Sequence, residues 1–323
     1  MRLLSAVVGV ILLFLSAPAT AAEGLRIIDL TGQFDRFAMS TEGMADGQRV
    51  MAFEKQIGPM AHGFYARKRS PAGYDFRVLV NLKTYPERRA RVLAVSQHFH
   101  QLFAKARQSF ERRFGPVGSS QPVYLIDSMG ELDGGTRELN GRPTLLFGAD
   151  VIAEVHSNKN MTAFFHHELF HLYHEAIVPS CLAIWCSLWE EGLATYVAHR
   201  LDPWANDDEL VLNLPRPIRP AVEANRARAI CEVLRLLDST SDDDFSALFQ
   251  GDDRLPGYPS RMGYYIGYLV ASDIGRTHEL HQMADMTLVQ ARPLIDASLR
   301  RMAICPTTTA EAHERSRTGR TSS

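Results

Sequence analysis

The sequence predicts an α+β protein with a mixed α/β N-terminal lobe and a mainly helical C-terminal lobe. Strand-like and helix-like apolar patterns both occur before residue 150, and only helix-like patterns follow it. Connectors rich in Pro, Asp and Gly separate these later helices. With 46% hydrophobic residues in a chain of 323, a sizeable core can be buried, which excludes wholesale disorder and fibrous repeats.

Residues 1–22 have the pattern of a secretory signal. Arg2 precedes the apolar run Leu3–Leu15, and the small residues of Ser16–Ala22 follow. A membrane span needs about 20 apolar residues, more than this run contains. We therefore expect the mature protein to be exported, periplasmic or secreted, without a stable membrane anchor.

Charge and cysteine content limit the kinds of partner and the covalent bonds that the protein is expected to have. The 35 Lys and Arg residues nearly balance the 37 Asp and Glu residues, so no global field favours nucleic acid as a partner. In an oxidising compartment the four cysteines are expected in disulfides. They allow three pairings, of which the local one joins Cys181 to Cys186 and leaves Cys231 to pair with Cys305; buried reduced thiols are the alternative.

The N-terminal lobe is assigned to residues 23–155. A Gly-rich turn region, Gly130–Gly141, separates its last two strands. The expected strands are Leu25–Leu30, Arg77–Leu82, Pro122–Asp127 and Arg142–Gly148, and the expected helices are Thr41–His62 and the segment from Pro86 to Gly115.

The C-terminal lobe is assigned to residues 156–305. The tail 306–323 has no periodic apolar face and is expected to be disordered. The expected helices are Ala163–Ala176, Leu188–Leu201, Pro220–Leu237, Met262–Ile274 and Leu294–Met302.

The chemistry concentrates in the first of these helices, where residues 167–171 read H-E-x-x-H. Positions i and i+4 of a helix share a face, so His167 and His171 can reach one metal ion. Glu168 then lies beside a water on that metal and can take its proton. A catalytic zinc site needs a third protein ligand and one open position.

The third ligand is expected on the next helix, where Glu191 follows His171 by twenty residues and begins an E-G-x-A segment. The neighbouring Glu190 is the competing candidate. With this segment the chain resembles the gluzincin metallopeptidases and bacterial predicted zinc proteases. We expect Gly192 to let the second helix pack closely against the first.

The resemblance implies a zincin-like catalytic domain that binds one Zn²⁺ per chain through His167, His171 and Glu191. It implies hydrolysis of peptide bonds in a peptide or protein substrate, with Glu168 as the general base. Tyr264, in a Y-x-x-G segment, matches the tyrosine that contacts the reacting carbonyl in this family, and Tyr268 is the second choice.

The resemblance spans residues 160–275 and is incomplete. We find no G-x-M-E-N segment and no thermolysin-type histidine acid, so exopeptidase action is unsupported. Thr144–Phe147 occupies the sequence position of the substrate-binding edge strand, which would favour an extended peptide. His174 is either a partner of the metal site or a partly exposed helix residue, and His166 is expected to be structural.

Two rival functions stay open at this stage. One is a non-catalytic envelope binding protein that keeps the fold and the metal. The other is a zinc amidase that acts on a non-protein or cell-wall peptide substrate.

Overall fold

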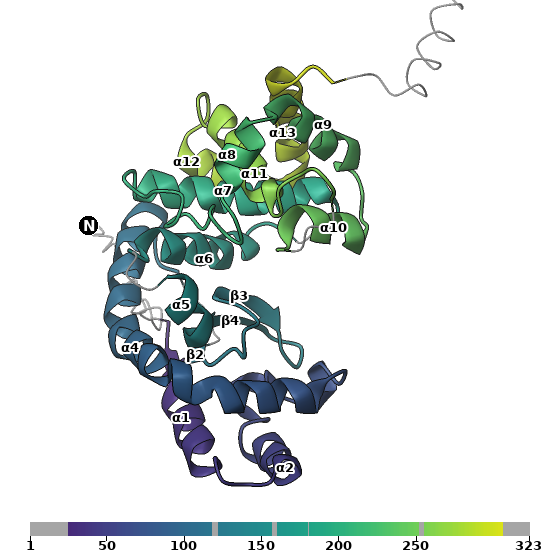
Figure 1. The fold of residues 1–323 in the computed structure, drawn as a ribbon. Coiled ribbons are helices and arrows are strands. Elements are labelled where there is room, and N and C mark those ends of the chain that lie inside the picture. Colours follow the sequence, from purple (N-terminus) through teal and green to yellow (C-terminus); the bar gives the residue numbers. More distant parts are fainter. Residues whose placement is uncertain (1–24, 118–121, 157–159, 180, 252–254, 306–323) are drawn as a thin grey trace, which may run out of the picture.

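The computed structural model describes residues 25–117, 122–156, 160–179, 181–251 and 255–305. It is a mixed α+β fold in which a small four-stranded sheet accompanies many helices, as the sequence predicts (Figure 1). The expected signal segment 1–22 and the expected disordered tail 306–323 lie outside the described residues. Of the helices described, none is both long and apolar enough to cross a membrane.

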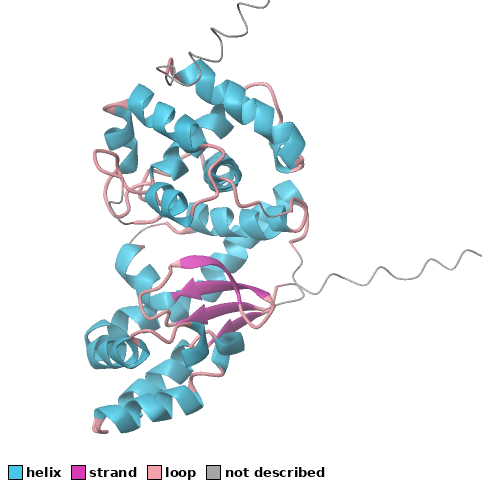
Figure 2. Cartoon of the chain, turned by 90° about the vertical axis from the view of Figure 1, so that its right-hand side faces the viewer, coloured by secondary structure: helices cyan, strands magenta, loops and turns pink. Residues whose placement is uncertain are grey.

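The sheet has the strand order β1-β2-β4-β3. Strands β1, β2 and β4 run parallel, whereas β3 pairs antiparallel with β4. Figure 2 shows the sheet on one side of the helices that the second half of the chain contributes. The strands are β1 (Ile27–Asp29), β2 (Val123–Ile126), β3 (Gly134–Glu138) and β4 (Pro143–Gly148).

The edge strand differs from the prediction. Thr144–Phe147 lies in β4, which has neighbours on both sides, and the edge is β3, inside the segment expected to be a turn. A two-residue hairpin explains the difference: Asn140 and Gly141 both have positive φ, and Leu139 and Arg142 exchange both backbone hydrogen bonds. Asn-Gly is the preferred dipeptide for such a turn.

The described residues of the first half form six helical segments, and one of them contradicts a predicted strand. Arg77–Leu82 is part of the long helix α4, because Val78 and Leu82 are buried while Val80 is 42% exposed. A strand would place all three side chains on one face. The segments are α1 (Thr31–Ser40), α2 (Asp46–Gln56), α3 (Met60–Gly63), η1 (Arg67–Arg69), α4 (Tyr74–Phe114) and α5 (Ala149–Val155).

Helix α4 continues through Pro86 instead of beginning there, and Figure 1 shows that it bends. Proline has no N–H, so the carbonyl of Leu82 loses its partner within the helix. The buried Arg49 of α2 donates to that carbonyl at 3.4 Å and to the carbonyl of Ala38 at 2.9 Å. The bend is therefore supported from outside the helix.

The second half consists of helices, as predicted, with changes in their bounds. The expected helix Pro220–Leu237 is divided in two, and two short helices were not foreseen. The helices are α6 (Thr162–Glu175), α7 (Ile184–Leu201), α8 (Ile218–Glu223), α9 (Arg226–Leu236), α10 (Asp242–Phe249), α11 (Met262–Ile274), α12 (Leu280–Ala284) and α13 (Leu288–Met302).

Aromatic packing fixes α6 between the sheet and α4. The ring of Phe165 lies 5.4 to 5.6 Å, between centroids, from the rings of Phe99 and Phe103 of α4 and Phe147 of β4. Such aromatic groups bury large areas and hold their neighbours in specific geometry. The helix that carries H-E-x-x-H is thereby held against both parts of the N-terminal half.

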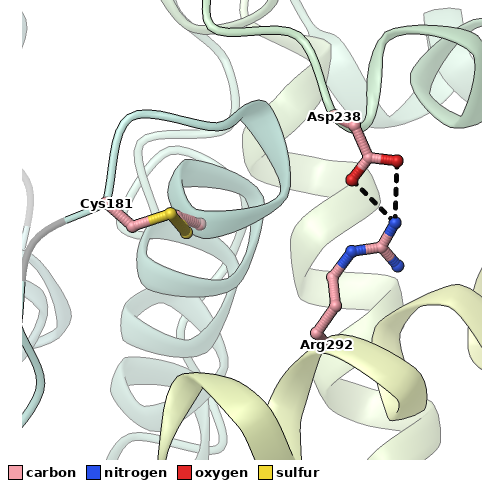
Figure 3. Close-up of a disulfide and its surroundings, with 4 residues drawn as sticks. Cys181, Asp238 and Arg292 are labelled. Atoms are coloured by element: carbon pink, nitrogen blue, oxygen red, sulfur yellow. Dashed lines mark hydrogen bonds and ion pairs between the residues drawn. A yellow bond between two sulfur atoms is a disulfide. The ribbon is translucent and has the colours of Figure 1, made fainter.

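The four cysteines form two disulfides, Cys181–Cys186 and Cys231–Cys305. The alternative of reduced thiols is wrong, and the pairing with a local bridge is confirmed. Figure 3 shows the first bridge at the start of α7, near the ion pair between Arg292 and Asp238. Two disulfides are compatible with an exported protein.

Candidate metal centre and active site

The two histidines of the motif lie on one face of α6 and point at the same place. Their Nε2 atoms are 3.0 Å apart. The opposite face of the helix is buried through Phe165, Leu169 and Phe170, so the helix cannot rotate without exposing that apolar surface. The i, i+4 spacing therefore brings the two imidazole rings together on one face of the helix, as helical geometry predicts.

Glu191 of α7 completes a triangle with these histidines. Its Oε2 lies 3.2 Å from Nε2 of His167 and 3.3 Å from Nε2 of His171. A tetrahedral ion with bonds of about 2.0–2.1 Å separates its ligands by about 3.3 Å, so the three atoms fit such an ion where they are. Among the described residues this is the group of His, Cys, Asp or Glu that can hold a metal ion.

Glu190, the competing ligand, lies outside the triangle. Its Oε1 is 3.8 Å from Nδ1 of His171, on the far side of that ring from the shared point. The carboxylate of Glu191 favours positive charge at the centre. Burial lowers the pKa of His171, but the attraction of the Glu191 carboxylate outweighs burial and raises this pKa to about 10. The charge of His171 in turn lowers the pKa of Glu191.

Thr195 orients one of the histidines, and the sequence analysis did not single it out. Its hydroxyl donates to the carbonyl of Glu191 at 2.8 Å, and its oxygen lies 3.4 Å from Nδ1 of His167. This contact favours the proton on Nδ1 and leaves Nε2 free for a metal. Its position four residues after Glu191 on the same helix was the available signal.

Glu168 lies beside the triangle with no partner for one of its oxygens. It is 7% exposed, and its Oε2 accepts no hydrogen bond from any residue the structure describes. Burial raises the pKa of Glu168 to about 8. Gly134 of β3 packs directly on it, since a Cβ there would come within 3.0 Å of the Glu168 side chain.

Tyr264 of α11 lies in the same cleft, and Tyr268 does not. The ring of Tyr264 is 6.3 Å from that of His167 and nearly parallel to it. The guanidinium of Arg261 lies 4.3 Å over the Tyr264 ring, and burial raises the pKa of Tyr264. The hydroxyl of Tyr268 is instead hydrogen-bonded to His199 at 2.8 Å, outside the cleft lining.

The distance between α7 and α11 depends on two glycines. A Cβ on Gly192 would lie 2.2 Å from the backbone of Gly267, and one on Gly267 would lie 2.3 Å from the carbonyl oxygen of Leu188. Gly192 therefore lets α7 approach α11, not α6 as the sequence analysis expected. This contact brings together the helices that carry Glu191 and Tyr264, which both line the cleft.

The remaining histidines of α6 have separate environments. His166 is buried against α4, where its Nε2 lies 2.7 Å from the hydroxyl of Ser109, and burial lowers its pKa to about 4; its structural role is confirmed. His174 is 4% exposed, not partly exposed, and stacks on Phe170. It lines a neighbouring cavity instead of the cleft.

The cleft itself has a volume of about 300 Å³ and is lined by charged residues of both signs. β3 and the start of α11 supply Arg137 and Arg261, and the facing helices supply Glu175 and Glu190. The sequence did not predict that β3 lines the cleft, because β3 lies in the segment expected to be a turn. The lining residues are Asp133, Gly134, Gly135, Thr136, Arg137, Phe164, His167, Glu168, His171, Glu175, Glu190, Glu191, Val211, Arg261 and Tyr264.

Comparisons with known proteins do not extend this description. The chain matches no family model, no curated protein and no solved structure.

Proposed function

We propose that the chain is an exported, zinc-dependent metallopeptidase of the gluzincin type with a zincin-like fold. One observation carries the proposal: three ligand atoms converge at 3.0 to 3.3 Å beside a buried carboxyl group without a partner, in an open cleft. Two histidines and one glutamate leave a fourth position of a tetrahedral ion open, as hydrolysis requires.

The ligand set supports zinc, which when bound would supply a Lewis acid that activates water and polarises a carbonyl. Glu168 would hold and return the proton, because it follows the ligand His167 directly and its buried Oε2 has no hydrogen-bond partner among the described residues. Tyr264 keeps its hydroxyl proton and can donate it in a hydrogen bond to the carbonyl oxygen of the substrate.

The edge strand β3 supports a peptide as the substrate. It pairs with β4 on one side, and no other described strand pairs with its outer side. Residues 133–137 line the cleft, so an extended peptide can pair with this edge and pass the metal centre. A compact small molecule would make no use of the strand.

The test is zinc content per purified mature chain, followed by a peptide-library digest. Glu191→Gln and Glu190→Gln form a matched pair, because one glutamate belongs to the triangle and its neighbour does not. We expect about one zinc in the wild type and in Glu190→Gln, and little in Glu191→Gln. Cleavage should disappear together with the zinc.

Other results would favour the rivals. Full zinc occupancy without cleavage of any peptide would indicate a non-catalytic binding protein. Cleavage restricted to amides of cell-wall peptides would indicate an amidase. A wild type that neither retains nor takes up zinc would contradict the proposal.

A further inference from the structure

An arginine at the start of α11 lies over the tyrosine of the cleft. The guanidinium carbon of Arg261 is 4.3 Å from the centroid of the Tyr264 ring, and both residues line the cleft. A cation at this distance over an aromatic face is attracted by the electrons of the ring. The two residues are three positions apart, and the backbone N–H of Tyr264 donates to the carbonyl of Arg261 at 3.1 Å. The arginine therefore belongs to the turn from which the tyrosine's helix begins.

The backbone of Arg261 adopts a conformation that arginine does not favour. Its φ of 58° and ψ of 22° are left-handed, at the position directly before α11. Glycine adopts these angles without strain, whereas the Cβ of an arginine makes them unfavourable. A turn needed only to start the helix would be formed better by glycine, so the side chain of Arg261 needs a separate explanation.

No carboxylate neutralises this arginine. Within the part of the chain that the structure describes, Arg261 has no ion pair, and its hydrogen bond to the carbonyl of Leu214 is long, at 3.5 Å. Arg137, which also lines the cleft, instead lies 3.6 Å from Glu131 and donates to the carbonyl of Thr136 at 2.9 Å. The charge of Arg261 therefore stays available to the ring that it covers and to the cleft.

Two other rings restrict Tyr264. The ring of Phe249 of α10 meets it edge-on, with centroids 6.0 Å apart, and the ring of His167 lies 6.3 Å away. A Cβ on Gly263 would come within 2.5 Å of the Phe249 ring, so α10 packs closely against this turn of α11. Together with Arg261, these contacts leave the tyrosine ring little freedom to turn, which fixes its hydroxyl before a substrate binds.

We propose that Arg261 is a positioning residue for the contact of Tyr264 with the substrate's carbonyl oxygen. Its guanidinium holds the phenol ring in the cleft. A cation over the ring also strengthens the hydroxyl as a hydrogen-bond donor, because it stabilises negative charge on the phenol. This effect grows in the transition state, where the carbonyl oxygen gains negative charge. The inference rests on the proposed peptidase function and adds a residue that acts through Tyr264.

The test is a double-mutant cycle on zinc-loaded full-length mature protein, with kcat and KM measured on one peptide identified in the library digest. Arg261→Met removes the charge and nearly keeps the length of the side chain, and Tyr264→Phe removes the hydroxyl alone. We expect Arg261→Met to lower kcat about tenfold with KM unchanged, since the contact acts in the transition state. On the Tyr264→Phe background the same substitution should change kcat less than about twofold.

Two further variants control for charge and for general damage. Arg261→Lys keeps a cation and should recover part of the lost kcat. Arg228 lies 4.8 Å over the ring of Tyr258, a similar pair outside the cleft lining, so Arg228→Met should leave kcat at the wild-type value. Zinc content and urea denaturation of each variant show whether the metal centre and the fold are intact.

Equal losses of kcat on the Tyr264 and Tyr264→Phe backgrounds would overturn the inference, because Arg261 would then act without the tyrosine. An increase in KM with kcat retained would also overturn it and make Arg261 a contact of the substrate. Full kcat in Arg261→Met or in Tyr264→Phe would have the same consequence. Each of these results requires a wild type that binds zinc and cleaves the peptide, so the proposed function would stay intact. A wild type without zinc and without cleavage would instead contradict that function itself.

Discussion

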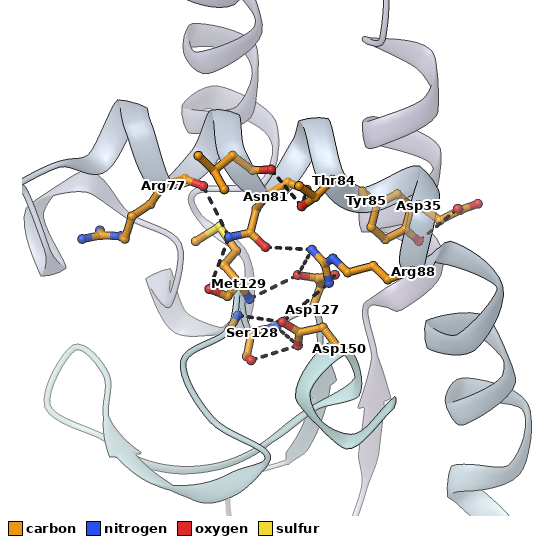
Figure 4. A network of polar contacts seen from close by, with 12 residues as sticks. Asp35, Arg77, Asn81, Thr84, Tyr85, Arg88, Asp127, Ser128, Met129 and Asp150 are labelled. Atoms are coloured by element: carbon orange, nitrogen blue, oxygen red, sulfur yellow. Dashed lines mark hydrogen bonds and ion pairs between the residues drawn. The ribbon is translucent and has the colours of Figure 1, made fainter. Parts of the chain in front are cut away.

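Two clusters of buried charged residues within the described chain are partnered in opposite ways. In the first, shown in Figure 4, Arg88 of α4 lies 2.6 Å from Asp127, and the backbone and hydroxyl of Ser128 both donate to Asp150. Asn81 accepts from the same arginine at 2.7 Å. In the second, three ligand atoms face one point and Glu168 lacks a partner.

This difference in hydrogen-bond partners distinguishes charged residues that hold the fold together from charged residues that can bind a ligand. A network with its partners present holds segments together, and here it ties the bend of α4 to the loop between β2 and β3. A buried group with partners missing has a free energy cost that a ligand can remove. The first network also supports the second site, because that loop leads directly into β3, which lines the cleft.

The largest expected effect is on the rate of hydrolysis. Replacing Glu168 with Gln removes the proton acceptor and keeps the shape, so peptide hydrolysis should fall about 10²–10⁴-fold. Zinc content, measured on the same sample, should stay at the wild-type value. An unchanged rate with bound zinc would mean that another group moves the proton.

The network of Arg88, Asp127 and Asp150 should contribute to the stability of the fold. Arg88→Met leaves Asp127 and Asp150 buried without their cation, so the free energy of unfolding should fall by about 3–5 kcal/mol in urea denaturation. Arg89→Met is the control, because Arg89 is half exposed and solvent screens its pair with Asp35, so a much smaller loss is expected. Equal losses in the two variants would break the comparison between the two clusters.

Removal of the metal should change the free energy of unfolding through the cluster of His167, His171 and Glu191. With free zinc at about 100–1,000 times its dissociation constant, chelation should lower the free energy of unfolding by about 3–4 kcal/mol. His171→Ala should show no such change on chelation. If the variant and the wild type respond equally, the stabilising ion is bound elsewhere.

A smaller effect concerns His166, whose Nε2 is partnered by α4 although its neighbour His167 is a candidate ligand. The folded pKa of about 4 lies below the unfolded value of 6.5, so the unfolded state binds more protons between these pH values. Stability should therefore fall by about 2–3 kcal/mol as pH drops from 6.5 to 4. His166→Asn should lack this part of the acid sensitivity, measured by denaturation at several pH values.

The sequence predicted best what local spacing determines. The i, i+4 histidines and the helix Met262–Ile274 follow directly from helical periodicity. The disulfides also agree, since a local bridge leaves one remaining pair. In these cases nearby residues fix the geometry without help from the rest of the fold.

Tertiary contacts decided what the sequence did not predict. The segment Arg77–Leu82 alternates like a strand, and the packing of Val78 and Leu82 makes it helical. β3 contains two glycines and was not recognised as a strand, although its Asn140–Gly141 turn was a usable signal. Tyr264 and Tyr268 are four residues apart and share a face of α11, so periodicity could not choose between them. The choice depends on which turn of α11 reaches the cleft.

The Gly192–Gly267 contact has a consequence for how this sequence can change over generations. Each glycine blocks the substitution of the other, because added atoms on either side would meet backbone and not a movable side chain. No compensating second mutation is therefore available at this crossing. Drift among descendants should stop at these two positions even where the surrounding helix surfaces diverge freely.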